Sequence, residues 1–169
     1  MNHQQKKTDG VQDLGALARG IIDSNIYMTL ATADEAGLPW ASPVWYAVTD
    51  YREFFWVSSP GARHSRNIAV RPQVAIVIFD SRAPEGTAQA VYVSAAAEEL
   101  AGEDLERGIG IFSRASAAAG GELSEWRLED VRAPAPYRLF RATASEHWVL
   151  DPDSSPDRRA PVALESAES

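Results

Sequence analysis

Apolar and polar residues alternate along most of the chain between residues 26 and 150, and short turn-forming segments interrupt the alternation. A period of two is typical of strands that bury one face, as where Ile26, Met28 and Leu30 fall on the same side. The first three such segments are separated by tight turns, which predicts a three-stranded antiparallel meander over residues 26–58. Strands are predicted over residues 26–32, 40–48, 53–58, 74–79, 90–96, 137–144 and 146–150.

Two segments show the wider spacing of short amphipathic helices instead. Residues 14–22 form the first, with Asp13 as its N-cap and Asn25 at its end. The second, over residues 63–70, must end before Pro72, because the residue before a proline is disfavoured in helical conformation. Helices therefore interrupt the strand pattern without replacing it.

A longer helix is predicted over residues 98–118, and a further helical turn over residues 124–131. The elements together predict a mainly β (α+β) fold, an antiparallel barrel of six or seven strands with short flanking helices. We expect residues 1–12 to be a flexible arm, residues 13–150 to form the barrel domain, and residues 151–169 to be a disordered acidic tail.

Composition excludes several classes of protein. Cysteine is absent, which excludes disulfide scaffolds, zinc–thiolate sites, iron–sulfur clusters and cysteine nucleophiles. The net charge of −8, from 16 basic and 24 acidic residues, makes nucleic acid an unexpected partner. The longest wholly apolar run, Val74 to Phe79, is far too short for a membrane helix, and no signal-peptide core is visible. We therefore expect a cytoplasmic protein without a membrane partner.

The segment Trp56–Asn67 carries the clearest candidate chemistry. A strand ends in two serines, turns at Pro60-Gly61, and leads into a helix with basic residues in its first turn. Free N–H groups at a helix N-terminus attract anions, and the forked guanidinium of Arg63 suits a phosphate. The alternative is a solvated turn with ordinary N-capping serines. The candidate phosphate-binding residues are Ser58, Ser59, Arg63, His64 and Ser65.

Two aromatic segments are further candidates. In the run from Trp40 to Tyr46, Pro43 cannot donate to a strand ladder, and the aromatic residues flank a possible slot for a planar ring. Trp148 lies on the last predicted strand and could cover a ligand or a subunit interface. Core packing is the alternative explanation of both segments. No metal site is predicted, because the spacing of His3, His64 and His147 is not that of metal ligands.

The stretches YMTLATADEAGLPWASPVWY and FFWVSSPGARHSRNIAVRPQVAIVIF resemble the pyridoxamine 5'-phosphate oxidase-like family of flavin-binding split barrels. VYVSAAAEEL and SEHWVLD resemble later strands of that family, so the resemblance covers roughly residues 20–150. It implies a homodimer of split barrels with FMN at the interface. Arg63 and His64 fall where the family's basic pair holds the FMN phosphate, and Val57 and Ser58 on the strand end beside it. Also implied at the flavin are Ser42, Pro43, Val44, Trp45 and, from the partner chain, Trp148.

The chain departs from the pattern of true pyridoxamine phosphate oxidases at several of their functional positions. His64 stands where those enzymes have Lys, Ser42 where they have Arg, Ala47 where a Lys touches the substrate, and Ala90 where they have Gln. Their C-terminal Arg-Leu-His motif is missing as well. Oxidation of pyridoxamine phosphate is therefore not expected.

The resemblance predicts an FMN-binding oxidoreductase that acts on a small-molecule substrate or electron acceptor. A flavin performs its own hydride chemistry, which agrees with the absence of an evident acid–base constellation. A deazaflavin-dependent reductase of the same fold is the first alternative. A non-catalytic module that carries flavin or haem, and an empty barrel used as a scaffold, are the others.

Overall fold

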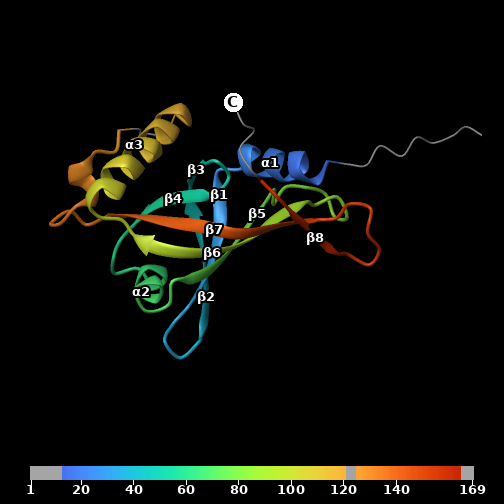
Figure 1. Cartoon of the computed structure of the whole chain (residues 1–169), viewed down its shortest axis with the longest axis horizontal. Coiled ribbons are helices and arrows are strands. Elements are labelled where there is room, and N and C mark those ends of the chain that lie inside the picture. The colour runs from blue at the N-terminus through green and yellow to red at the C-terminus, as the bar shows by residue number, and fades with distance from the viewer. Residues whose placement is uncertain (1–12, 121–124, 165–169) are drawn as a thin grey trace, which may run out of the picture.

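A computed structural model of the chain describes residues 13–120 and 125–164; the predicted arm over residues 1–12 lies outside them. The described part has three α-helices, a short 3-10 helix and eight strands (Figure 1). The helices are α1 (Leu14–Ser24), α2 (Arg63–Val70), α3 (Gly102–Ala118) and η1 (Leu128–Val131). The strands are β1 (Tyr27–Ala33), β2 (Pro39–Trp45), β3 (Ala47–Thr49), β4 (Glu53–Ser58), β5 (Gln73–Phe79), β6 (Ala90–Glu99), β7 (Arg138–Leu150) and β8 (Arg159–Val162).

The strands form one antiparallel sheet in the order β2-β1-β5-β6-β7-β4-β3, with β8 added to β7. Because β2 and β3 are consecutive in the chain, the two ends of this order are joined and the sheet curls into a split barrel. The predicted mainly β fold with flanking helices is therefore confirmed. The predicted three-stranded meander is wrong, since β2 pairs with β1 while β3 pairs with β4.

Tyr46 causes that difference. Its side chain is buried, its hydroxyl donates to Ile22 O at 2.6 Å, and its N–H donates to Ile26 O at 3.2 Å. These bonds to the end of α1 and the start of β1 bend the chain, so that β2 and β3 become edge strands on opposite sides of the opening. The sequence pattern shows one continuous strand here, because a bend does not change which residues are apolar.

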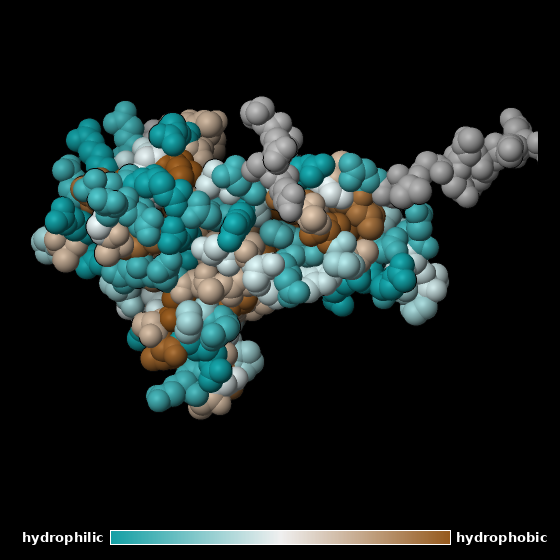
Figure 2. Space-filling view, in the orientation of Figure 1, coloured by the Kyte–Doolittle hydropathy of each residue, from teal (hydrophilic) through white to brown (hydrophobic). Residues whose placement is uncertain are grey.

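Apolar side chains are buried in two layers. The larger cluster fills the barrel and includes Leu30, Trp56 and Ile76, with α1 packed against it. The smaller cluster lies on the other side of the sheet, where Phe55 and Leu139 meet α3. Figure 1 shows α1 above the strands, α2 below them and α3 to the left. Over α3 the surface is largely hydrophilic (Figure 2), as its exposed charged residues require.

Ion pairs connect α3 to the sheet beside the smaller cluster. Arg107 donates to both carboxylate oxygens of Glu53, at 2.9 and 2.7 Å. Arg141 also reaches Glu53, at 3.0 Å, and donates to Glu98 at 2.7 Å. The hydrogen bond from Arg107 is the main reason why the pKa of Glu53 is lowered. A bidentate pair between a guanidinium and a carboxylate fixes the relative orientation of the two groups and pairs their charges.

The main differences from the predicted boundaries concern β6 and β7. Strand β6 continues to Glu99, so α3 begins at Gly102 and not at residue 98. The strands predicted over residues 137–144 and 146–150 are one strand, β7, with a bulge. The extra residue is Ser145, whose hydroxyl donates to Ser94 O at 3.0 Å. A bulge inserts one residue into the alternation, and this shift imitates a strand end.

Part of the predicted disordered tail is ordered. Arg159–Val162 form β8, which pairs with His147–Leu150 of β7, and Leu164 is buried against the barrel core. Pro161 and the acidic residues around this segment conceal a short edge strand, where proline is tolerated. In the described part of the chain, no helix is long and apolar enough to span a membrane.

Gly108 allows α3 to approach the sheet closely. A Cβ atom there would lie 2.8 Å from Leu100 Cδ1, 3.0 Å from Leu139 Cδ2 and 3.2 Å from Phe55 Cε1. We therefore expect Gly108→Ala to lower the free energy of unfolding by about 1–3 kcal/mol, the usual cost of overpacking. Urea unfolding followed by circular dichroism measures this loss.

The matched control is Gly110→Ala on the same helix, where a Cβ atom would meet only Arg114 Nη1 at 3.5 Å. Alanine is the better helix former, so this variant should gain up to about 1 kcal/mol. Equal stability of the two variants would mean that the approach of α3 at Gly108 is not tight.

Candidate functional site

The turn between β4 and α2 brings three of the predicted residues together. His64 Nε2 lies 2.7 Å from Ser58 Oγ, and His64 Nδ1 lies 3.2 Å from Ser42 Oγ. The imidazole therefore bridges the end of β4 and the middle of β2, from the first turn of α2. Sequence reasoning selected all three residues but did not predict this bridge.

His64 is buried, and burial lowers its pKa below the ordinary value. At neutral pH the ring is therefore uncharged, with one nitrogen donating and the other accepting a hydrogen bond. One serine must then donate to the ring while the other accepts from it. His64 orients two hydroxyl groups, and it does not supply the second positive charge of a basic pair.

Arg66 carries one positive charge at this turn and donates to Gly61 O, and Arg63 carries another. Its guanidinium carbon lies 4.5 Å from the centroid of the Trp40 ring, a cation–π contact that holds the side chain beside the start of α2. Ala62, the N-cap residue, offers no side-chain acceptor to the helix, and the first turn holds no acidic residue. The free N–H groups and Arg63 therefore favour an anion at this end of α2.

The other two serines have different roles. Ser59 Oγ accepts the N–H of Gly61 at 3.2 Å, and so shapes the turn itself. Ser65 is buried, and its hydroxyl is shielded from solvent without a hydrogen-bond partner. Its hydroxyl therefore does not share the surface with Arg63. Val57, the remaining residue of this group, packs against the cluster under α3.

Successive residues of β2 point to opposite sides of the sheet. Ser42 and the buried Val44 lie on the inner side, and Ser42 meets α2 there. Pro43 and Trp45 lie on the outer side, where the Trp45 ring meets Phe112 of α3 edge-on at a centroid distance of 5.0 Å. The predicted run Ser42–Trp45 is thus divided. Two residues face the barrel and the α2 turn, and two face outward.

The outer side of β1, β2 and β5 forms a surface without charges, which we call the outer face. On β1, the residues of the outer face alternate with the buried Met28 and Leu30. The strand register then identifies the residues beside them on β2 and β5. No charged side chain occurs among them, and Tyr27 and Phe79 are 56% and 43% exposed. The outer face consists of Tyr27, Thr29, Ala31, Ala33, Pro39, Ala41, Pro43, Trp45, Gln73, Ala75, Val77 and Phe79.

Trp148 lies far from the α2 turn within one chain. The register places Pro43, Thr29, Val77, Tyr92 and Trp148 in one row across five strands. Four strand spacings of about 4.8 Å make this row roughly 19 Å long, measured along the curved sheet. The structure therefore does not bring Trp148 to the other predicted residues of the same chain.

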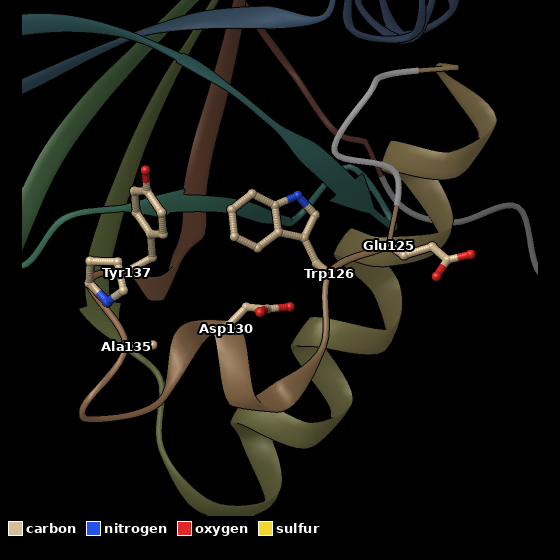
Figure 3. Close-up of a pocket in the computed structure, with 6 residues that line it drawn as sticks. Glu125, Trp126, Asp130, Ala135 and Tyr137 are labelled. Atoms are coloured by element: carbon tan, nitrogen blue, oxygen red, sulfur yellow. The ribbon is translucent and has the colours of Figure 1, made fainter.

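Sequence reasoning missed a cavity of about 420 Å³ beside η1 (Figure 3). Trp126 and Tyr137 stand on two sides of it, with ring centroids 5.8 Å apart and planes at 84°, and Asp130 lies between them. The missed signal was Trp126, an aromatic residue outside the predicted strands, close in sequence to Tyr137 at the start of one. In the described residues, no three His, Asp or Glu side chains are close enough to hold a metal ion.

Comparison with known proteins adds the family. The family described as pyridoxamine 5'-phosphate oxidase matches residues 15–151, most of the chain. The chain belongs to the pyridoxamine 5'-phosphate oxidase-like family. Among curated proteins there is no match.

Solved structures show the same fold at low sequence identity. A haem-binding protein from Mycobacterium smegmatis is 22% identical, with a TM-score of 0.66 over 87% of this chain; the chain spans only 57% of that protein. An FAD-binding protein from Mesorhizobium loti is 21% identical, with a TM-score of 0.57 over 79% of this chain and 91% of the other. An F420 reductase is 17% identical, with a TM-score of 0.58 over 77% of this chain and 94% of the other.

The α2 turn of this family member fits the phosphate end of FMN in charge and in free donors. Arg63 and the uncapped N–H groups of α2 are donors that a phosphate needs, and the Ser58 hydroxyl is another in the tautomer where His64 Nε2 donates to it. His64 fits as a neutral hydrogen-bonding group only. The Ser65 hydroxyl and the Val44 side chain, both enclosed, do not add to the fit.

Burial of His64 has a consequence for stability. Because its pKa is lowered in the folded state, the unfolded chain takes up a proton first as pH falls below about 6.5. The free energy of unfolding should therefore decrease between pH 7.5 and pH 5.5, and His64→Asn should reduce this dependence. Urea unfolding at both pH values is the measurement.

His147 contributes in the same direction, since burial also lowers its pKa although its Nε2–H donates to Tyr51 O at 2.8 Å, a bond that opposes the shift. Some dependence should therefore remain in His64→Asn. An unchanged slope in that variant would contradict the assignment of a neutral, buried His64.

Proposed function

We propose that this chain is an FMN-binding oxidoreductase whose α2 turn holds the phosphate of the cofactor. The observation that carries the proposal is the uncapped N-terminus of α2, with Arg63 stacked on Trp40 and no acidic residue in the first turn. An anion compensates a positive side chain at a positive helix end, which would otherwise be unfavourable. Membership of the family and the FAD-binding structural neighbour support a flavin.

The residues of the α2 turn would have different roles in binding FMN. Arg63 would pair with the phosphate, and the free N–H groups of α2 would donate to it. Neutral His64 holds the Ser58 and Ser42 hydroxyls in fixed orientations. Pro43, Trp45 and Val57 would offer apolar surface to the planar ring, and the bound flavin supplies the hydride chemistry.

The second chain of a homodimer would complete this site. The outer face lacks charges and is too extended to remain exposed at low cost, which favours burial against a second copy. If the two-fold axis of the interface crosses the middle of the row from Pro43 to Trp148, each end of the row meets the opposite end of the partner's row. Trp148 of one chain would then approach Pro43 and the flavin of the other, as the family resemblance implies.

The substrate is a small molecule or electron acceptor other than pyridoxamine phosphate, since Ser42, Ala47 and Ala90 replace the family's polar residues. The acidic net charge supports a partner other than nucleic acid, and we propose a cytoplasmic location. A deazaflavin would use the same phosphate donors, and a titration with it in place of FMN separates the two cofactors.

Haem binding is less well supported by the described histidines. His64 uses both ring nitrogens, and His147 uses Nε2. Neither imidazole offers Nε2 as an axial ligand without breaking a bond. An absorption spectrum of the purified protein, recorded before and after addition of FMN and desalting, shows directly whether flavin or haem bands accompany the protein.

Arg63→Ala should weaken FMN binding about 10- to 100-fold, because a hydrogen bond to a charged group contributes about 1.5–3 kcal/mol. Riboflavin, which lacks the phosphate, should bind the variant and the wild-type chain equally. Fluorescence titration of both ligands provides the dissociation constants.

The control is Arg82→Ala, which removes one positive charge from an exposed side chain in the β5–β6 loop. Its affinity for FMN should remain that of the wild type. If Arg63→Ala weakened FMN and riboflavin equally, the phosphate would not lie at α2.

Val77→Glu places a charge in the middle of the outer face and should convert the dimer to a monomer that no longer retains FMN. Ala117→Glu, on the exposed side of α3, adds the same charge elsewhere and should leave the dimer intact. Sedimentation velocity with detection of flavin absorbance follows both properties. A monomeric wild-type chain that retains FMN would contradict the proposed interface.

A further inference from the structure

The cavity beside η1 is connected to the proposed flavin site in two ways. Tyr137 precedes Arg138, the register partner of Ser58 at the end of β4. Trp126 meets Phe112 at a centroid distance of 5.9 Å, and Phe112 in turn meets Trp45. Rings thus connect the cavity to β2, and the strand ladder connects it to the α2 turn. One residue, Phe112 or Arg138, therefore separates the lining of the cavity from residues assigned to the flavin.

The size of the cavity suits a small aromatic molecule. Its volume of about 420 Å³ lies at the lower end of the range for ligand sites. Trp126 and Tyr137 are nearly perpendicular, so one planar guest can contact the face of one ring and the edge of the other. Pro136 and Ala135 close the apolar side.

The charge of the lining favours a cation. Asp130 and Glu125 are its charged residues, and both are acidic. The Asp130 carboxylate is held in place by the N–H of Arg127, which donates to Oδ2 at 2.8 Å. The Arg127 guanidinium is directed to Glu125 and Glu129, at 3.7 and 3.8 Å, and does not line the cavity. In Figure 3 the Glu125 carboxylate points away from the two rings.

We propose that this cavity binds a planar organic cation, an N-substituted heteroaromatic ring or an aromatic amine, as the small-molecule partner of the flavin. Aromatic faces attract cations, and the fixed Asp130 carboxylate adds a Coulombic attraction that repels anionic rings. The assignment of this molecule as the partner rests on the proposed function. Binding of the cation by the cavity does not.

The test compares three probes of one shape at pH 8: the 1-methylquinolinium cation, neutral quinoline and anionic quinoline-2-carboxylate. Isothermal titration calorimetry of the flavin-free full-length chain measures each affinity. The cation should bind about tenfold more tightly than quinoline, in the range of a cation–π contact assisted by a carboxylate, and the anion more weakly than both. Equal affinities for the three probes would overturn the proposal.

Asp130→Asn keeps an oxygen that can accept the Arg127 N–H while removing the charge. It should weaken the cation about fivefold or more and leave quinoline unchanged, as expected for loss of a nearby opposite charge. Glu85→Gln, an exposed change in the β5–β6 loop, is the charge-matched control and should change neither. Trp126→Leu should weaken both probes and Trp126→Phe should preserve them, with circular dichroism confirming that each variant is folded.

A second readout separates this proposal from the proposed function. In the FMN-loaded chain, the cation should perturb the visible flavin band, and Asp130→Asn should reduce the perturbation. Failure of FMN to bind while the cation still prefers the wild-type cavity would reject the proposed function and retain the site. A flavin band that responds to no probe, with cation binding intact, would reject the cavity as the partner site of the flavin.

Discussion

Tyr46 lies where the chain leaves one edge of the sheet and enters the other, and its hydroxyl donates to Ile22 O at 2.6 Å inside the core. Burial raises the pKa of this phenol, so the donor stays protonated at any physiological pH. The bend that it fixes sets the position of β2 against both α2 and α3. This bond therefore helps to hold the closure of the barrel, in which β2 is the strand that both halves of the candidate site share.

Strand β2, which precedes this bend, has two roles because its side chains point alternately to the two sides of the sheet. On the inner side, Trp40 holds Arg63 and Ser42 holds His64, which prepares the α2 turn for an anion. On the outer side, Pro43 and Trp45 extend an apolar surface toward α3 and the cavity. One edge strand thus connects recognition of a charged group with recognition of a flat ring.

Much of this arrangement could be predicted from the sequence, because strands with one buried face and a helix start after Pro60-Gly61 leave local patterns. The turn residues Arg63 and His64 were found in this way. The bridge from His64 to Ser42 could not be predicted, since it joins positions 22 residues apart through the curl of the sheet. The bulge at Ser145 was missed for a similar reason, since it depends on Ser94 of another strand. Strand β8 was missed because Pro161 and nearby acidic residues conceal it, and the cavity because its lining follows no periodic pattern.

The pairing of β8 with β7 limits edge-to-edge strand pairing between copies of the chain. Strand β4 covers one side of β7 only over Arg138–Thr143, and β8 covers that strand again from His147 to Leu150. At the β2 edge of the sheet, Pro39 and Pro43 interrupt the donors that another strand would need. A chain that ended before Arg159 would expose the hydrogen-bonding groups of β7 beside Trp148. Strand β8 therefore prevents another chain from adding a strand to this part of β7. The faces of the sheet remain as the surface for self-association.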